Sequence, residues 1–231
     1  MTIMKTDTDS HCRVIPLRGV RGMIADNMRK SLDEAAQLTH HADCDASALL
    51  ATKARLGDQG VKVSMEDLIA HAVVAVLGRH PDLNGRVEAR EIRLNPQIHL
   101  SMAMALPGNT LVAPAIFDAG NLSLMDRSAA RKALQQRARS GKLTVPEMTG
   151  GTFTISNLGL SRVRHFTPIV NLPQIAILGI GETRQRPWVS EDGELAVRPV
   201  MGLSLSFDHR ALDGAPAADF LSDLCRQIER G

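Results

Sequence analysis

The segment 64–77 constrains the fold of this chain more than any other part of the sequence. Residues 68–77 (LIAHAVVAVL) are apolar except for His71, so a helix formed by them is apolar almost all round. Ser64 stands before this run and Asp67 follows three residues later, which is the spacing of a capping box at a helix start. A helix without a polar face must be buried, which predicts other elements packed around residues 68–77.

Four further helices are predicted from apolar spacing and capping residues. The first has one apolar stripe made of Val20, Ile24, Met28 and Leu32. The others are predicted at 48–56 with Ser47 as the N-cap, from the cap Ser123 to residue 138, and at 217–228.

Strand patterns occur between these helices, at 39–47, 98–106, 111–117, 151–156, 175–181 and 203–207. The segments 98–106 and 111–117 are predicted to form a hairpin around 107–109 (PGN), and 191–193 (EDG) is predicted as a turn between two further short strands. Gly179-Ile180-Gly181 is predicted to end a strand in a turn. Because strands and helices mix without strict βαβ alternation or a repeat, the pattern favours a mixed-sheet α/β sandwich.

Composition excludes several classes of protein. With five Phe, one Trp and no Tyr, the core must be aliphatic, and 27 basic and 25 acidic residues are interspersed without the basic stripe of a nucleic-acid-binding face. Cys12, Cys44 and Cys225 are odd in number and widely separated, which indicates packing residues in a reducing compartment. The chain lacks a signal-like start and any run of about 18 apolar residues, so we expect a cytoplasmic protein without a membrane partner.

His209 is the residue best suited to act as a catalytic base. It follows the alternating segment 203–207 (LSLSF), which predicts a position at a strand end, and Asp213-Gly214 predicts a turn four residues later. An imidazole can take a proton from a thiol or a hydroxyl near neutral pH if its ring is held in one orientation. Asp208, Arg210 and Asp213 offer polar atoms for that support.

Three ordered segments resemble one known family. Residues 208–214 (DHRALDG) resemble the active-site signature of the dihydrolipoamide acyltransferases of 2-oxoacid dehydrogenase complexes, which share their fold with chloramphenicol acetyltransferase. Residues 150–159 (GGTFTISNLG) and 168–179 (PIVNLPQIAILG) resemble the family's two other best-marked motifs, and weaker similarity at 16–21 and 80–84 extends over almost the whole chain. The resemblance implies a chloramphenicol acetyltransferase-like mixed-sheet α/β sandwich and a coenzyme A-dependent acyltransferase.

The resemblance also implies a role for each matching residue. His209 matches the base that deprotonates the acceptor, and Ser156 matches the hydroxyl donor that stabilises the oxyanion of the tetrahedral intermediate. Asp213 matches an acidic residue that organises the site through a basic partner in the first helix, here Arg29 or Lys30. In relatives the base and the hydroxyl donor come from adjacent subunits, so the resemblance implies a homotrimer, with acetyl-CoA as co-substrate and no bound cofactor.

The chain departs from the family's pattern at three places. Ala36-Gln37 stands where relatives commonly have Pro-His, Phe117 where they often have a basic residue, and Leu172 where proline is common. None of these is His209 or Ser156. Each change alone can be drift, but together they allow a reshaped substrate channel.

The predicted domain organisation indicates which molecule accepts the acetyl group. Residues 1–13 are predicted as a flexible N-terminal tail and 14–231 as the acyltransferase catalytic domain, without the lipoyl and subunit-binding domains of complex-forming enzymes. We therefore expect a free-standing enzyme that moves acetyl from acetyl-CoA to a small-molecule hydroxyl, as in natural-product pathways such as tetronate O-acetylation. One alternative is a dihydrolipoamide acyltransferase core served by a separate lipoyl protein. The other is an inactive scaffold, which the joint presence of His209, Ser156 and Asp213 disfavours.

The remaining histidines and glycines indicate no further site. His40, His41 and His71 lack the spacing of metal ligands, so we predict no metal. The sequence has no P-loop and no dinucleotide-binding glycine fingerprint, so recognition of coenzyme A rests on the resemblance and its contact residues are not predicted. His165, close to the Ser156 segment, is the one further histidine expected to approach the site.

Overall fold

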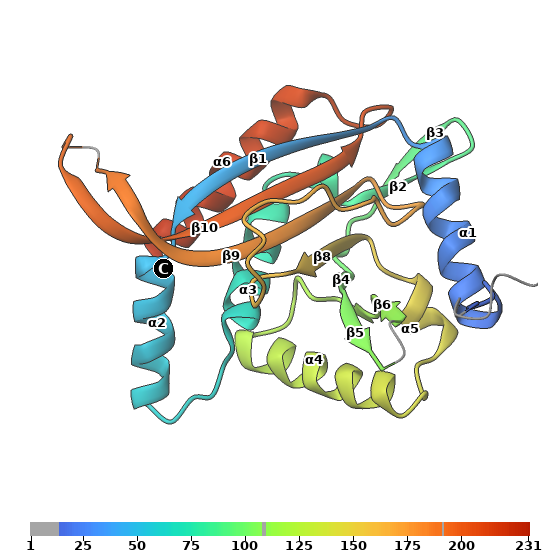
Figure 1. Ribbon diagram of the computed structural model, residues 1–231, viewed down its shortest axis with the longest axis horizontal. Coiled ribbons are helices and arrows are strands. Elements are labelled where there is room, and N and C mark those ends of the chain that lie inside the picture. Colours follow the sequence, from blue (N-terminus) through green and yellow to red (C-terminus); the bar gives the residue numbers. More distant parts are fainter. Residues whose placement is uncertain (1–13, 108–109, 191) are drawn as a thin grey trace, which may run out of the picture.

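A six-stranded mixed sheet forms the centre of the molecule (Figure 1), and the predicted mixed α/β architecture is confirmed. The computed structural model describes residues 14–107, 110–190 and 192–231, so the predicted tail 1–13, with Cys12, lies outside the described residues. In spatial order the strands are β1 (Gln37–Asp45), β10 (Leu195–Asp208), β9 (Ala176–Val189), β8 (Phe153–Asn157), β4 (Leu100–Met102) and β7 (Ala115–Ile116). Strand β8 is parallel to β9 and β4, and the other pairs are antiparallel.

Helices cover one face of the long strands. The helices are α1 (Gly19–Glu34), α2 (Ser47–Asp58), α3 (Met65–Leu77), α4 (Leu124–Arg139), α5 (Val145–Thr149) and α6 (Gly214–Arg230), and a 3-10 turn, η1, spans Pro81–Leu83. Helix α6 runs alongside β1 and packs on α3 (Figure 1). Leu205 and Phe207 of β10 share one hydrophobic core with Phe220 and Leu224 of α6. Among the described residues, no helix has the length and apolar character needed to cross a membrane.

Helix α3 forms as the sequence predicts. The Ser64 hydroxyl accepts from the Asp67 backbone N–H, and the Asp67 carboxylate accepts from the Ser64 backbone N–H, so the capping box is complete. Nine of its residues are buried, whereas His71 and Ala75 are exposed. The buried helix therefore has one narrow strip that faces the surface.

The Asp67 carboxylate also anchors α3 to α4. It accepts from Arg131 Nε at 2.6 Å and from the Ser128 hydroxyl at 3.0 Å, and only 3% of the residue is exposed. Burial alone would raise the pKa of Asp67, but the hydrogen bonds from Arg131 and Ser64 outweigh it and lower that pKa to about 2.

We predict that Asp67→Asn lowers the free energy of unfolding at pH 7 by about 2 kcal/mol. A carboxyl whose pKa is lowered in the folded state stabilises the protein above its unfolded pKa and loses this effect as pH falls through the folded value. The wild type should therefore lose this stability between about pH 4 and pH 2, and the variant should not. Urea unfolding across this pH range measures both. Asp126→Asn is the control, because Asp126 holds the same position after the exposed N-cap Ser123 that Asp67 holds after Ser64. An equal loss of stability in Asp126→Asn would contradict the prediction.

The sheet's other face is crossed by the extended segment 158–175. The carbonyl oxygen of Arg164 comes so close to the sheet that a Cβ on Gly181 would lie 1.8 Å from it, and a Cβ on Gly202 would lie 2.0 Å from it. A Cβ on Gly179 would lie 2.8 Å from the Phe166 ring. The prediction that Gly179-Ile180-Gly181 ends a strand is therefore wrong, because β9 continues to Val189 and these glycines make room for the crossing segment.

Two other strand predictions need correction. The short strands expected on either side of 191–193 are the outer ends of β9 and β10, which pair up to Val189 and Leu195 and form an arm that projects from the sheet (Figure 1). Strands 98–106 and 111–117 do pair as a hairpin, but it is broken into β4–β7 and into β5 (Met104–Leu106) with β6 (Thr110–Val112). The break falls where Ala103 N–H donates to the Ile155 carbonyl of β8 and Pro114 offers no N–H. Of the predicted turn 107–109, only residue 107 is described.

Two details of the predicted helices are also wrong. Ser47 is the first residue of α2 and not its cap; its N–H donates to the Asp45 carboxylate at 2.8 Å. In α1, Leu32 is 52% exposed although it belongs to the predicted apolar stripe, whereas Ser31 is buried and donates to the Val170 carbonyl at 2.6 Å. A hydrogen bond thus fixes the buried side of α1 near its end.

A small hairpin of β2 (Gly85–Glu88) and β3 (Glu91–Leu94) completes the elements.

Candidate active site

His209 lies where the sequence predicts, one residue beyond the end of β10. Its backbone N–H donates to the Ala36 carbonyl at 2.8 Å, which ties it to the start of β1. Its side chain is 45% exposed, and its Nδ1 lies 3.6 Å from Asp213 Oδ1. An N–H on Nδ1 directed at this carboxylate would leave the Nε2 lone pair free to accept a proton.

The turn that carries His209 is held by Asp208 and Arg210. Asp208 is fully buried, and its carboxylate accepts from Arg210 Nη2 at 2.6 Å and from the Ala36 N–H at 3.3 Å. We expected Asp208 and Arg210 to support the imidazole directly, but they bind each other. Of the three polar neighbours considered, Asp213 is the one that contacts the ring.

Asp213 is the N-cap residue of α6, and its side chain makes no capping hydrogen bond and is 85% exposed. A carboxylate at a helix N-terminus interacts favourably with the helix dipole. The basic partners expected in α1 are engaged elsewhere: Arg29 pairs with Asp33 at 3.0 Å and Lys30 with Glu34 at 3.9 Å.

Ser156 lies half-buried near the end of β8, opposite Gly179 of β9. Gly179 is in turn opposite Ser204, and Ser204 opposite His41, so these residues form one row across the sheet. Residues in one row point to the same face, here the face crossed by segment 158–175. The Phe166 ring covers Gly179 and so stands between Ser156 and Ser204.

Within one chain, Ser156 and His209 do not meet. They are separated by two strand spacings across the sheet and five residues along β10, which corresponds to roughly 20 Å. That distance is too long for both side chains to act on one carbonyl group. A single chain therefore keeps the two predicted site residues apart, and we call the surroundings of each a candidate half-site.

His165 lies on the Ser156 side of the sheet but is bound to β1. Its Nε2 is 3.1 Å from Asp43 Oδ1, and its ring centroid is 5.2 Å from that of His41. Burial, followed by the charge of His165, lowers the pKa of His41. Asp43 is also paired with Arg164, so this cluster fastens segment 158–175 to the sheet. The structure thus places His165 in the cluster that holds segment 158–175 on β1.

Sequence reasoning missed Phe166 as a neighbour of Ser156. The signal that could have found it is the glycine pair Gly179 and Gly181 inside an apolar strand, because glycine in a strand interior marks a close approach by another segment.

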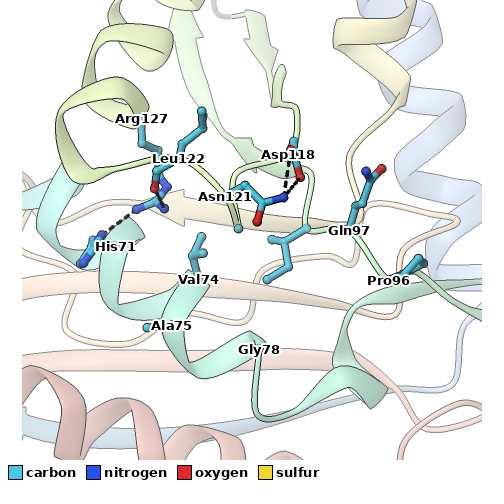
Figure 2. Close-up of a pocket in the computed structure, with 12 residues that line it drawn as sticks. His71, Val74, Ala75, Gly78, Pro96, Gln97, Asp118, Asn121, Leu122 and Arg127 are labelled. Atoms are coloured by element: carbon cyan, nitrogen blue, oxygen red, sulfur yellow. Dashed lines mark hydrogen bonds between the residues drawn. The ribbon is translucent and has the colours of Figure 1, made fainter.

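One cavity among the described residues lies away from both Ser156 and His209. It has a volume of about 370 Å³ and lies between α3, α4 and the segments 96–98 and 118–122 (Figure 2). At its edge Arg127 Nη1 donates to His71 Nδ1 at 2.8 Å. A second cavity of about 330 Å³ lies between α1, the β2–β3 turn and residues 171–173. Neither cavity is lined by His209 or Ser156.

Comparison with known proteins first defines the fold class. Chloramphenicol acetyltransferase matches with a TM-score of 0.56 at 14% identity, over 94% of this chain and 97% of that one. The predicted chloramphenicol acetyltransferase-like fold is confirmed. A sequence model of the family "2-oxoacid dehydrogenases acyltransferase (catalytic domain)" matches residues 9–230, and the chain belongs to this family.

Individual relatives are similar over most of this chain. The dihydrolipoyllysine-residue acetyltransferase component of the acetoin cleaving system of Bacillus subtilis is 38% identical over 230 residues, 97% of this chain and 57% of that protein. The chain thus spans about half the length of the curated relatives it matches. The structure of Azotobacter vinelandii dihydrolipoamide acetyltransferase matches with a TM-score of 0.87 at 30% identity. That enzyme was studied for the catalytic roles of a serine, a histidine and an asparagine that stands four residues after the histidine. The match covers 99% of this chain and 97% of the Azotobacter vinelandii chain. The cubic core of a pyruvate dehydrogenase multienzyme complex matches with the same coverage of both chains, a TM-score of 0.87 and 30% identity.

These relatives correct the predicted acceptor. The chain belongs to an acyltransferase family, as expected, but the prediction of a natural-product O-acetyltransferase is wrong, because the relatives are dihydrolipoyl acyltransferases. They favour the alternative, and they give no support to a role in tetronate or antibiotic biosynthesis. The physical reason for the error is that one base and one oxyanion donor serve a hydroxyl or a thiol equally, so the catalytic residues do not identify the acceptor.

Proposed function

We propose that this chain transfers an acetyl group between coenzyme A and the thiol of a dihydrolipoyl group, as the catalytic core of a 2-oxoacid dehydrogenase-type complex. The observation that carries the proposal is the His209–Asp213 pair at the end of β10, together with Ser156 on β8. A relative whose catalytic mechanism was investigated has a serine, then a histidine, then an asparagine four residues on. Here Asp213 follows His209 at the same spacing and faces its ring.

The chemistry follows from the atoms that each half-site offers. Nε2 of His209 takes the proton of the attacking thiol, and Asp213 stabilises the imidazolium that forms. The thiolate then attacks the thioester carbonyl of acetyl-CoA, and the Ser156 hydroxyl donates to the oxyanion. Collapse of this intermediate expels the coenzyme A thiolate, which recovers the proton from His209. We propose acetyl-CoA as a co-substrate, no resident cofactor and no metal.

The complete site needs two chains. Because Ser156 and His209 are roughly 20 Å apart in one chain, we propose that His209 of one protomer faces Ser156 of the next in a homotrimer. In support, a relative forms a cubic core, and every corner of a cube lies on a threefold axis. Large apolar side chains are also exposed at and before α1, as expected of a surface that a neighbouring chain covers: Val14, Ile15, Leu17, Met23 and Leu32.

The acceptor is tested by offering the purified protein acetyl-CoA with dihydrolipoamide or with a panel of small alcohols. We predict acetyl transfer to dihydrolipoamide, with release of free coenzyme A, and no ester formation above the uncatalysed rate. Acetyl-dihydrolipoamide and esters are both followed by mass spectrometry, because exchange of one thioester for another leaves the thioester absorbance unchanged. Transfer to neither acceptor by a folded protein would contradict the proposed function.

A further inference from the structure

Cys44 and Cys225, predicted as separate packing residues, meet where β1 packs against α6. Cys44 is fully buried on the core side of β1, and Cys225 is half-buried and packs on the same core. Next to them, the backbone N–H of Asp45 donates to Glu229 Oε1 at 3.2 Å. Asp45 is the residue after Cys44 in β1, and Glu229 lies about one helical turn after Cys225 in α6. This bond independently places this part of α6 beside the end of β1 that carries Cys44.

The two thiols differ in their readiness to ionise. Interaction with the Cys225 thiol, followed by burial, raises the pKa of the Cys44 thiol. Interaction with the Cys44 thiol lowers the pKa of Cys225, against burial and the nearby carboxylate of Glu229 and with the help of Arg226. The Cys44 S–H has a neutral acceptor as well, the Met201 carbonyl at 3.7 Å. Cys225 is therefore the thiol that ionises first and that solvent reaches, while Cys44 stays protonated behind it.

We propose that Cys44 and Cys225 form a redox-sensitive dithiol that a hydroperoxide oxidises to a disulfide between β1 and α6 within one chain. The Cys225 thiolate attacks the peroxide oxygen, the O–O bond breaks, and Cys225 becomes a sulfenic acid with release of an alcohol. The Cys44 sulfur then attacks the Cys225 sulfur, and its proton leaves with the hydroxyl group as water. Two thiols and one hydroperoxide thus give one disulfide, one alcohol and one water.

The position of the dithiol separates it from acyl transfer. Cys44 lies at the end of β1 far from Ala36, and Cys225 lies three turns along α6 from Asp213, so both are remote from His209. The oxidation state of the pair can therefore be measured without any substrate, and its outcome is independent of the proposed function.

The test uses the full chain, reduced and then treated with a small excess of tert-butyl hydroperoxide. Remaining thiols are alkylated after denaturation. Of the three cysteines, we expect two to become inaccessible to alkylation, with the mass of the chain lowered by about 2 Da. Proteolysis should yield a Cys44–Cys225 linked peptide that dithiothreitol separates. Retention of alkylatable Cys44 and Cys225, or linkage through Cys225 or Cys12 to a second chain instead, would overturn the proposal.

Two variants assign the order of events. In Cys44→Ser, Cys225 has no resolving thiol, so peroxide should drive it to the sulfinic acid, about 32 Da heavier. In Cys225→Ser, Cys44 should stay a free thiol because it is buried. This second change alters a half-exposed helix position and so keeps the test valid if Cys44→Ser fails to fold. Oxidation of Cys44 in Cys225→Ser at the wild-type rate would contradict the assigned roles.

Discussion

Replacing His209 by glutamine is expected to lower kcat for acetyl transfer to dihydrolipoamide by about 10³-fold, because the amide cannot take the thiol proton. The fold should be unaffected. The His209 side chain is 45% exposed and its described polar contact is the one with Asp213 at 3.6 Å, while the backbone bond to Ala36 is independent of the side chain. Steady-state kinetics, with circular dichroism and sedimentation on the same samples, measure the effect.

His71→Gln is the matched control for this prediction. His71 is also exposed and also makes one side-chain contact, to Arg127, which a glutamine carbonyl oxygen can replace. It lines the cavity of Figure 2, away from both half-sites. Activity in His209→Gln within tenfold of the wild type, or an equal loss in His71→Gln, would remove His209 from the mechanism.

The elements that could be predicted from sequence are those with a local cause. Helix α3 begins at Ser64 because the capping box is a contact between residues three apart, and its burial follows from its own composition. The position of His209 could be predicted for the same reason, since the alternating strand before it and the turn after it are neighbours in sequence.

Features that depend on distant segments could not be predicted. The glycines inside β9 can indicate that another segment comes close, but nothing near them in sequence shows that this segment is the backbone around residue 164. Leu32 fits a helical stripe, but the side that is buried is fixed by the Ser31 bond to Val170, 139 residues away. The acceptor depends on a still more distant partner, a molecule outside the chain.

The separation of Ser156 and His209 predicts that two inactive variants will restore each other's activity. Ser156→Ala loses the oxyanion donor, which should lower kcat by about 10²- to 10³-fold, and His209→Gln loses the base. In a trimer formed from both chains, a site that takes His209 from the Ser156→Ala chain and Ser156 from the His209→Gln chain is complete. Random assembly gives about one quarter of all sites this composition, so the whole co-expressed population should have roughly a quarter of wild-type activity, and trimers that contain both chains should have about one third.

The design contains its own controls. Mixing either variant with the double variant should restore nothing, because the mixed trimer then lacks every His209 imidazole or every Ser156 hydroxyl. A different affinity tag on each variant, followed by purification on both tags in turn, isolates the trimers that contain both chains for assay. If both side chains of a site belonged to the same chain, no mixture could exceed the average of its two parents. A restored activity would thus require the two half-sites, roughly 20 Å apart in one chain, to meet across a subunit interface.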